Sequence, residues 1–181
     1  MKFTESPLKG CFVIDPEIRS DQRGWFGRTF CVNEFSAIGL NSEWKQINYS
    51  HTSFAGTVRG LHFQHNPYQE VKLIHCVKGS VQDVILDLRK GSETFLSYYT
   101  ILLSAQNHRM IYIPKGMAHG FQSLEDESEL IYHHSEFYQP SAEGGINIGD
   151  PRIALTWPLE IRNLSERDKN FGMLCSEFKG I

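Results

Sequence analysis

Short runs rich in β-branched and aromatic residues recur along the 181-residue chain, and turn signals separate them about every 8–12 residues. This spacing leaves little room for long helices and is typical of an antiparallel sandwich or barrel. The connections include Lys78-Gly79 and the turn-like segments 89–92, 114–116 and 143–145. The predicted strands, in chain order, are CFVIDPEI, GWFGRTFCV, WKQINYSHT, TVRGLHFQ, EVKLIHCV, SVQDVILDL, FLSYYTILL, RMIYIP, HGFQSL, ELIYHHSEF, GINIG and IALTWPL.

Helix is predicted at only two places. Residues 32–40, VNEFSAIGL, can form one or two turns. Residues 163–172, NLSERDKNFG, look like a capped helix start with Ser165 as the N-cap and Asp168 at N3. Because no linker, repeat or low-complexity segment divides the chain, we predict one all-β domain with a few short helices.

The composition argues against several classes of partner. Apolar residues make up 40% and charged residues 22% of the chain, and the formal net charge is -3, so nothing favours nucleic acid or an acidic membrane surface. No apolar run reaches the roughly 18 residues of a membrane span, and the opening MKFTESPLKG lacks the apolar segment of a signal peptide. We expect a cytoplasmic protein whose basic side chains serve a local purpose.

One predicted strand, residues 70–77, carries a lysine among apolar side chains. Alternation puts Lys72 on the same face as Ile74 and Cys76. An unpaired charge on a buried face costs several kcal/mol, so the ammonium needs either solvent or a partner. Lys72 is therefore either a charge that protects an edge strand from aggregation or part of a polar site.

Other polar residues lie on neighbouring predicted strands. Arg59 and His62 are three residues apart, so a regular strand sends them to opposite faces. Gly60 between them can form a bulge that turns both toward one opening. Tyr132 and His134 share a face, where each is either a core residue with a polar end at the rim or part of the same site.

Eight segments between residues 21 and 168 resemble in order those of the dTDP-4-dehydrorhamnose 3,5-epimerases, the RmlC-like sugar-nucleotide epimerases of the cupin superfamily. The segments are DQRGWFGRTF (21–30), QINYS (46–50), VRGLHFQ (58–64), EVKLIHCVKGSVQDVILDLRKGSETF (70–95), IPKGMAHGF (113–121), LIYHHSEFYQP (130–140), EGGINIGDP (143–151) and LSERD (164–168). The resemblance implies a single RmlC-like cupin domain over residues 1–181, a jelly-roll barrel of antiparallel strands.

The resemblance also implies an activity. Enzymes of this family act on a nucleotide-linked 4-keto-6-deoxyhexose, with dTDP as the expected nucleotide, in deoxysugar biosynthesis such as that of dTDP-L-rhamnose. They remove a proton beside the ketone and return it to the other face of the sugar, which needs a base, an acid and a positive charge near the enolate, and no cofactor. By resemblance, the catalytic residues are His62 as base, Asp168 as the carboxylate that orients it, Lys72 as cation and Tyr132 as acid.

Substrate binding is likewise implied by the resemblance. Arg59 and His119 match the side chains that hold the diphosphate, and the forked guanidinium of Arg59 suits phosphate oxygens. The other substrate-binding residues that it implies are Arg23, Arg28, Gln46, Asn48, Tyr138, Glu143 and Arg167. The family's swapped first strands imply a homodimer. Four residues, Arg28, Met117, His133 and Arg167, depart from those the family commonly carries, and none of them is the implied base, acid or cation.

Two other functions remain as alternatives. A metal-dependent cupin could use His62, His65, Glu70 and His119, and PKGMAH has the spacing of a cupin second motif, but the His-x-His pair of the first motif is missing. A non-catalytic sugar-nucleotide-binding jelly roll would not need all four implied catalytic residues. The sequence thus predicts an epimerase without a metal, and leaves open the nucleotide, the hexose and whether carbon 3, carbon 5 or both are inverted.

Overall fold

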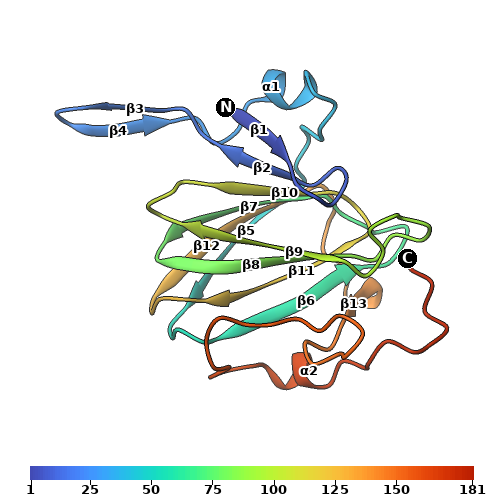
Figure 1. Ribbon diagram of the computed structural model, residues 1–181. Coiled ribbons are helices and arrows are strands. Elements are labelled where there is room, and N and C mark those ends of the chain that lie inside the picture. The colour runs from blue at the N-terminus through green and yellow to red at the C-terminus, as the bar shows by residue number, and fades with distance from the viewer.

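The strands form two antiparallel sheets that face each other, in a computed structural model that describes residues 1–181 (Figure 1). One sheet has six strands in the order β1-β2-β10-β7-β12-β5, and the other has five in the order β13-β6-β11-β8-β9. The strands are β1 (Lys2–Glu5), β2 (Phe12–Asp15), β3 (Ile18–Asp21), β4 (Gly24–Gly27), β5 (Gln46–Thr52), β6 (Val58–Gln64), β7 (Lys72–Lys78), β8 (Ser80–Asp87), β9 (Tyr98–Ser104), β10 (Met110–Ile113), β11 (Met117–Ser123), β12 (Ser128–His134) and β13 (Glu143–Gly145). The helices are α1 (Val32–Ser36), the 3-10 turn Pro140–Ala142 and α2 (Glu166–Lys169).

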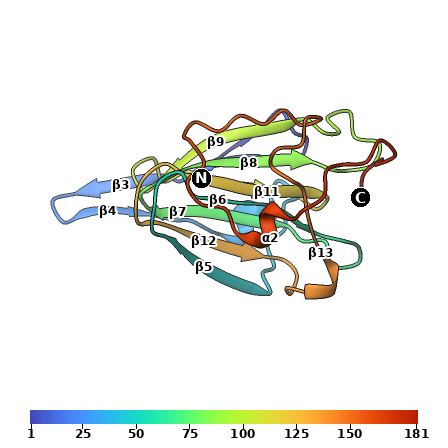
Figure 2. The ribbon, with the colours of Figure 1, turned by 90° about the horizontal axis from the view of Figure 1, so that it is seen from below.

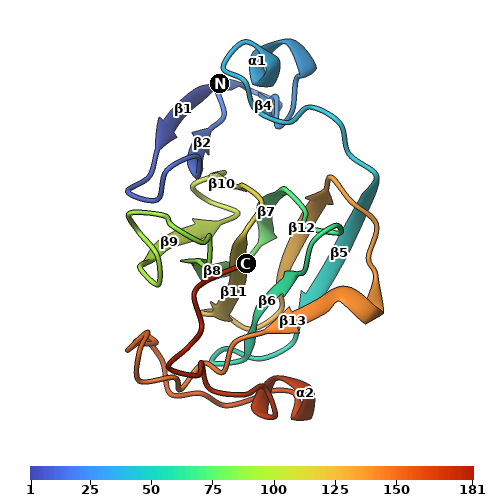
Figure 3. The ribbon, with the colours of Figure 1, turned by 90° about the vertical axis from the view of Figure 1, so that its right-hand side faces the viewer.

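Two peripheral parts frame this barrel. The β3–β4 hairpin forms a separate two-stranded sheet that extends away from the body of the molecule (Figures 1 and 2). The C-terminal segment crosses the five-stranded sheet and carries α2 against β6 (Figures 1 and 3). None of the helices has the length and apolar character needed to span a membrane.

The core is divided into three clusters by the two sheets. The central cluster lies between them, because it takes Ile74 and Leu130 from the six-stranded sheet and Val81, Leu103 and Phe121 from the other. A second cluster covers the outer face of the five-stranded sheet beneath the C-terminal segment, and a third packs α1 on the outer face of the six-stranded sheet. Each fully buried aliphatic side chain contributes about 1.5–3 kcal/mol, so all three layers stabilise the barrel.

Most of the predicted elements are confirmed, and three predictions are wrong. The predicted runs from residue 44 to residue 137 overlap β5–β12, with ends that differ by one or a few residues. Ser165 caps α2 by accepting a hydrogen bond from the Asp168 backbone N–H at 3.1 Å. Residues 153–159, IALTWPL, form no strand, because Ile153 and its apolar neighbours pack on the outside of the five-stranded sheet without pairing. GINIG pairs only through Gly145, and β1 (Lys2–Glu5) was not predicted.

Candidate active site

A cavity of about 590 Å³ is lined by residues from both sheets. Its walls come from β5, β6, β7, β11, β12 and the segment that leads into α2. This volume is in the usual range for small-molecule sites. The predicted residues that line it are Asn48, Arg59, His62, Lys72, His119, Tyr132, Tyr138, Glu143, Arg167 and Asp168.

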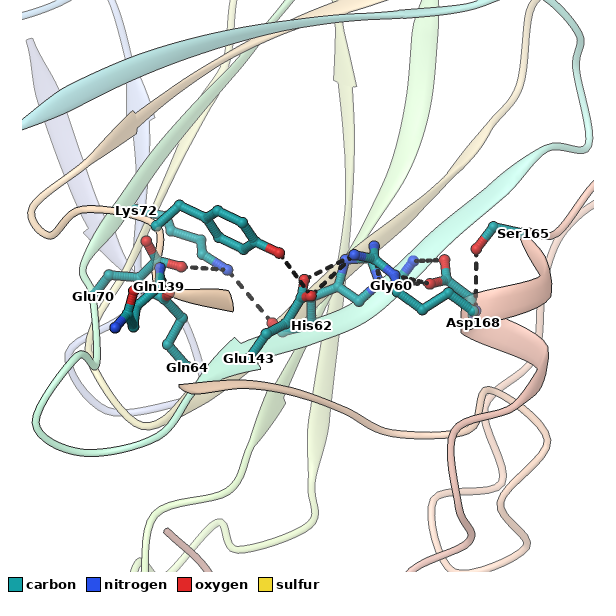
Figure 4. A network of polar contacts seen from close by, with 11 residues as sticks. Gly60, His62, Gln64, Glu70, Lys72, Gln139, Glu143, Ser165 and Asp168 are labelled. Atoms are coloured by element: carbon teal, nitrogen blue, oxygen red, sulfur yellow. Dashed lines mark hydrogen bonds and ion pairs between the residues drawn. The ribbon is translucent and has the colours of Figure 1, made fainter. Parts of the chain in front are cut away.

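His62 and Asp168, which both line this cavity, form a hydrogen-bonded pair (Figure 4). The His62 Nε2 atom lies 2.8 Å from the Asp168 Oδ1 atom, and the Gly60 N–H donates to Oδ2 at 3.1 Å. Burial raises the pKa of Asp168, but the hydrogen bonds from His62 and Gly60 outweigh it and set the pKa at about 2. The ionised carboxylate therefore holds the proton on Nε2 and leaves Nδ1 as the unprotonated nitrogen of His62.

The predicted bulge in β6 is confirmed. The pairing with β11 shifts by one residue, since His62 pairs with His119 and Arg59 pairs with Phe121. Gly60 has φ = +122°, and a Cβ atom there would lie 2.5 Å from the Gly120 Cα atom. This local irregularity lets Arg59 and His62 line the same cavity, although they are three residues apart.

Lys72 lies on a central strand, so the edge-strand alternative is wrong. Its strand β7 pairs with β10 on one side and β12 on the other. The ammonium is 3.2 Å from Glu70 Oε1 and donates to the His62 backbone carbonyl at 3.4 Å. Glu70 in turn accepts a hydrogen bond from His134 Nδ1 at 2.8 Å. Lys72 thus has the buried partner that its position requires.

Tyr132 brings a phenol to the same cavity from β12. Its hydroxyl lies 3.0 Å from the Ser50 hydroxyl of the neighbouring β5. Burial raises the pKa of Tyr132 well above its ordinary value, against the opposing effect of the Ser50 hydrogen bond. The phenol is therefore protonated at neutral pH and available as a proton donor.

His119 forms a second histidine–carboxylate pair, deeper in the barrel. Its Nε2 atom lies 2.7 Å from Asp83 Oδ2, and both residues are buried. Burial raises the pKa of Asp83 despite the opposing effects of His119 and Lys72. One imidazole nitrogen of His119 is thus committed to Asp83, and the role of His119 as a diphosphate ligand stays a prediction.

Arg167, Glu143 and Tyr138 form a hydrogen-bonded polar rim beside His62. Arg167 donates to Glu143 at 3.0 Å, and the Tyr138 hydroxyl donates to the same carboxylate at 3.0 Å. The guanidinium also lies 3.2 Å from His62 Nε2. This rim places a cation and two further polar groups beside the histidine–carboxylate pair.

Three predicted binding residues do not line the cavity of this chain. Arg23 pairs with Asp21 on the exposed β3–β4 hairpin, and Arg28, just after the hairpin, pairs with Glu34 at 2.9 Å. Gln46 lies at the start of β5 and accepts a hydrogen bond from the Tyr138 backbone N–H. The single chain therefore assembles the predicted catalytic residues without the two arginines.

The four side chains of the metal-dependent alternative have separate partners. Glu70 pairs with Lys72 and His134, His119 with Asp83, and His62 with Asp168, while the His65 ring packs against Phe63. No three His, Cys, Asp or Glu side chains in the structure lie together in an arrangement that could hold a metal ion.

Comparison with known proteins identifies the family. Residues 5–176 match the sequence profile described as dTDP-4-dehydrorhamnose 3,5-epimerase. The chain belongs to the dTDP-4-dehydrorhamnose 3,5-epimerase family, whose members are carbohydrate isomerases. The dTDP-4-dehydrorhamnose 3,5-epimerase of Methanothermobacter thermautotrophicus is 40% identical over 94% of this chain and 92% of its own length. The dTDP-4-dehydrorhamnose 3-epimerase of Streptomyces niveus is 37% identical over 97% of this chain and 84% of its own.

The fold agrees with that of this epimerase family. The solved structure of the dTDP-4-dehydrorhamnose 3,5-epimerase from Bacillus anthracis, with TDP and PPi bound, superposes with a TM-score of 0.93 at 36% identity, covering 96% of this chain and 99% of that one. The predicted cupin-type jelly roll is thereby confirmed.

Sequence reasoning gave four residues of the site no part in epimerisation. Ser50 contacts Tyr132, Asp83 contacts His119, and Glu70 and His134 hold Lys72. The shared face of Tyr132 and His134 was the one available signal for His134. Asp83 lies in a run of apolar residues with no pattern that marks it as the partner of His119.

Proposed function

We propose that this protein inverts carbon 3, carbon 5 or both of a dTDP-linked 4-keto-6-deoxyhexose, without a cofactor, in deoxysugar biosynthesis. The observation that carries the proposal is the convergence of an oriented imidazole, a buried ammonium and a buried phenol on one cavity. These are the base, the cation and the acid that epimerisation beside a ketone requires. Family membership supports dTDP as the nucleotide.

The first step is removal of a proton from the carbon beside the ketone. His62 Nδ1 takes the proton, since Nε2 already donates to Asp168 at 2.8 Å. The electron pair of the broken C–H bond moves to the ketone oxygen and gives an enolate. The Asp168 carboxylate stabilises the imidazolium that forms and keeps the ring in place.

Lys72 stabilises the enolate oxygen. Its ammonium is about nine-tenths buried, so solvent screens its charge only weakly. A positive charge about 4 Å from the developing oxyanion is worth ~4 kcal/mol at an effective dielectric constant of about 20. The attraction between Lys72 and this oxygen stabilises mainly the transition state, because the ketone oxygen carries a full charge only after the proton has left.

The second step is return of a proton to the opposite face of the sugar. Tyr132 is the donor in our proposal, and Ser50, whose hydroxyl lies 3.0 Å away, is its route for reprotonation. A phenol that stays protonated in the resting enzyme meets the first requirement for this role. Whether one carbon or both are inverted depends on how the sugar turns past Tyr132 and Tyr138.

We also propose a homodimer in which the hairpin of one chain reaches the cavity of its partner. Trp25 and Phe26, which follow each other in β4 of the hairpin, are 57% and 71% exposed, which is unusual for two large apolar side chains. Such an arrangement would bring Arg23 and Arg28 to the nucleotide of the partner subunit. Cytoplasmic location is part of the same proposal.

The decisive experiment is deuterium incorporation. The protein is incubated in heavy water with dTDP-linked and other nucleotide-linked 4-keto-6-deoxyhexoses, and deuterium and configuration at carbons 3 and 5 are measured by NMR. The wild type should exchange and invert at least one carbon, and His62→Ala should abolish both. The control is His65→Ala, because His65 follows the same strand but does not line the cavity. Exchange at the wild-type rate in His62→Ala would contradict the proposal.

A further inference from the structure

A buried polar cluster of Glu70, Lys72 and His134 forms one wall of the cavity. The side chains of Glu70 and Lys72 are each only 9% exposed, and that of His134 is 11% exposed. Burying two charges and an imidazole is costly, and apolar side chains of similar volume often stabilise a fold equally well. Stability alone therefore gives no reason for this cluster.

The hydrogen bonds of Lys72 leave one donor for a ligand. An ammonium has three N–H groups. One points to Glu70 Oε1 at 3.2 Å and a second to the His62 carbonyl at 3.4 Å (Figure 4). The third has no partner within the protein, and Lys72 lines the cavity. The contacts of Lys72 with Glu70 and with the His62 carbonyl thus fix the direction of its third N–H group.

Glu70 is held as a carboxylate by its neighbours. Burial raises the pKa of Glu70, but the hydrogen bond from His134 and the charge of Lys72 outweigh it, so the pKa lies below its ordinary value. One carboxylate oxygen faces Lys72 and the other faces His134. Because both oxygens are engaged, the carboxylate cannot rotate away from the ammonium without losing a bond.

His134 connects this carboxylate to the rest of the site. Its Nδ1 atom lies 2.8 Å from Glu70 Oε2, and its Nε2 atom lies 3.4 Å from the Asn48 amide nitrogen. These contacts fit a neutral ring that donates from Nδ1 and accepts at Nε2. The ring also stacks on Tyr132, with centroids 6.2 Å apart and an angle of 21° between the planes.

We propose that Glu70 and His134 are positioning residues that aim the free N–H of Lys72 at the enolate oxygen, an inference that rests on the proposed epimerase function. Glu70 holds the ammonium directly, and His134 acts through Glu70. The carboxylate also offsets part of the positive charge that the enolate would feel. Glu70 therefore speeds the reaction by orienting the ammonium and not by adding charge. If a variant without Glu70 catalysed exchange faster than the wild type, the proposal would be overturned.

The kinetic test uses Glu70→Gln, His134→Phe and the double variant. His134→Phe keeps an aromatic ring against Tyr132 and removes only the hydrogen bonds. Each single variant should slow deuterium exchange about 10-fold to 100-fold, with KM changed less than about threefold, because the bond to the enolate forms mainly in the transition state. The double variant should be no more than about twofold slower than Glu70→Gln, since both changes disrupt one unit.

Several outcomes of this test would overturn the proposal. They are wild-type exchange in Glu70→Gln, a change confined to KM, and a double variant whose defect equals the product of the two single defects. Glu5→Gln is the matched control, because it removes an exposed carboxylate on β1 that only accepts from the Gly10 N–H. Glu70→Asp is a second variant, for the case that Glu70→Gln does not fold. It keeps the buried charge, but its side chain is too short to reach Lys72 and His134 together, so it should also slow exchange.

A second measurement needs no substrate. Acetic anhydride acylates free amines, and an ammonium held by a carboxylate is protected. Peptide mass spectrometry should show Lys72 acylated about 10-fold faster in Glu70→Gln than in the wild type or in Glu5→Gln. Equal rates would overturn the positioning role. If the wild type exchanged no deuterium into any sugar while Lys72 still showed this difference, the proposed function would fail and the Glu70–Lys72 contact would stand.

Discussion

Replacing Asp168 with asparagine changes one atom and reverses the hydrogen bonding of the base. In the wild type, one carboxylate oxygen accepts from His62 and the other from the Gly60 N–H. Asparagine has only one oxygen. If that oxygen faces Gly60, its NH2 group faces His62 Nε2 and moves the ring proton to Nδ1, the nitrogen that must be free. If it faces His62, the Gly60 N–H is left opposite another donor, at a cost of about 1–3 kcal/mol.

The size of the effect follows from the charge that Asp168 supplies. In the proposed mechanism His62 takes the substrate proton and becomes an imidazolium whose Nε2 atom is 2.8 Å from the Asp168 carboxylate. With charge centres about 4 Å apart and an effective dielectric constant of about 20, this attraction is ~4 kcal/mol. Since ~1.4 kcal/mol corresponds to a factor of ten in rate, and the amide dipole keeps part of the attraction, Asp168→Asn should slow exchange about 10²-fold to 10³-fold.

The assay is the initial rate of deuterium incorporation at carbons 3 and 5, with binding of dTDP measured separately by calorimetry. Binding of dTDP should change little, because Asp168 acts on the base. The control is Glu166→Gln, in the same helix, whose carboxylate is exposed and pairs only with Lys169 at 2.6 Å. An Asp168→Asn variant that exchanges deuterium within about threefold of the wild-type rate would refute the reasoning.

Three further predictions concern other groups. Tyr132→Phe should lower inversion about 10²-fold while exchange falls less than tenfold; unchanged inversion in the NMR assay would exclude Tyr132 as the donor. Overnight treatment with EDTA should leave activity unchanged, whereas a loss restored by a divalent ion would favour the metal-dependent cupin. Burial raises the pKa of Asp87, but hydrogen bonds from Arg89, Ser92 and Thr94 outweigh it and set the pKa at about 2. Because the folded pKa lies below the unfolded one, this carboxylate should contribute about 2 kcal/mol above about pH 4 and lose it as pH falls toward 2, which denaturant titration of wild type and Asp87→Asn would measure.

The fold was largely predictable because strand and turn signals are local. Turn residues at regular intervals separate β5–β12. The four-residue pattern from Ser165 to Asp168 is enough to predict the Ser165 cap. IALTWPL has the same local composition as a strand, yet its backbone N–H at Leu159 bonds to the side chain of Gln122. Whether an apolar run pairs or only packs depends on which sheet edge is free, and that is not a local property.

The site was predictable only in part, because it depends on pairing between distant strands. Resemblance supplied His62, Lys72, Tyr132 and Asp168, and all four line one cavity. Their partners follow from register: β12 and β7 put His134 opposite Lys72, 62 residues earlier in the chain. No periodicity within one strand reveals which residue lies across from it.

The same register carries a mechanistic consequence for the whole barrel. Along the inner faces of β7 and β12, Lys72 pairs with His134, Ile74 with Tyr132 and Cys76 with Leu130. The polar pair and Tyr132 line the cavity, whereas Cys76 and Leu130 belong to the central core cluster. Each strand thus provides both a proposed catalytic group and apolar side chains that pack next to it. The apolar side chains of Ile74, Cys76 and Leu130 exclude water from one side of the cavity. This exclusion strengthens the attraction between Lys72 and an enolate. A slip of one residue between these strands would turn Tyr132 and His134 to the outer face together, so the proposed catalysis depends on the β7–β12 pairing as much as on the side chains themselves.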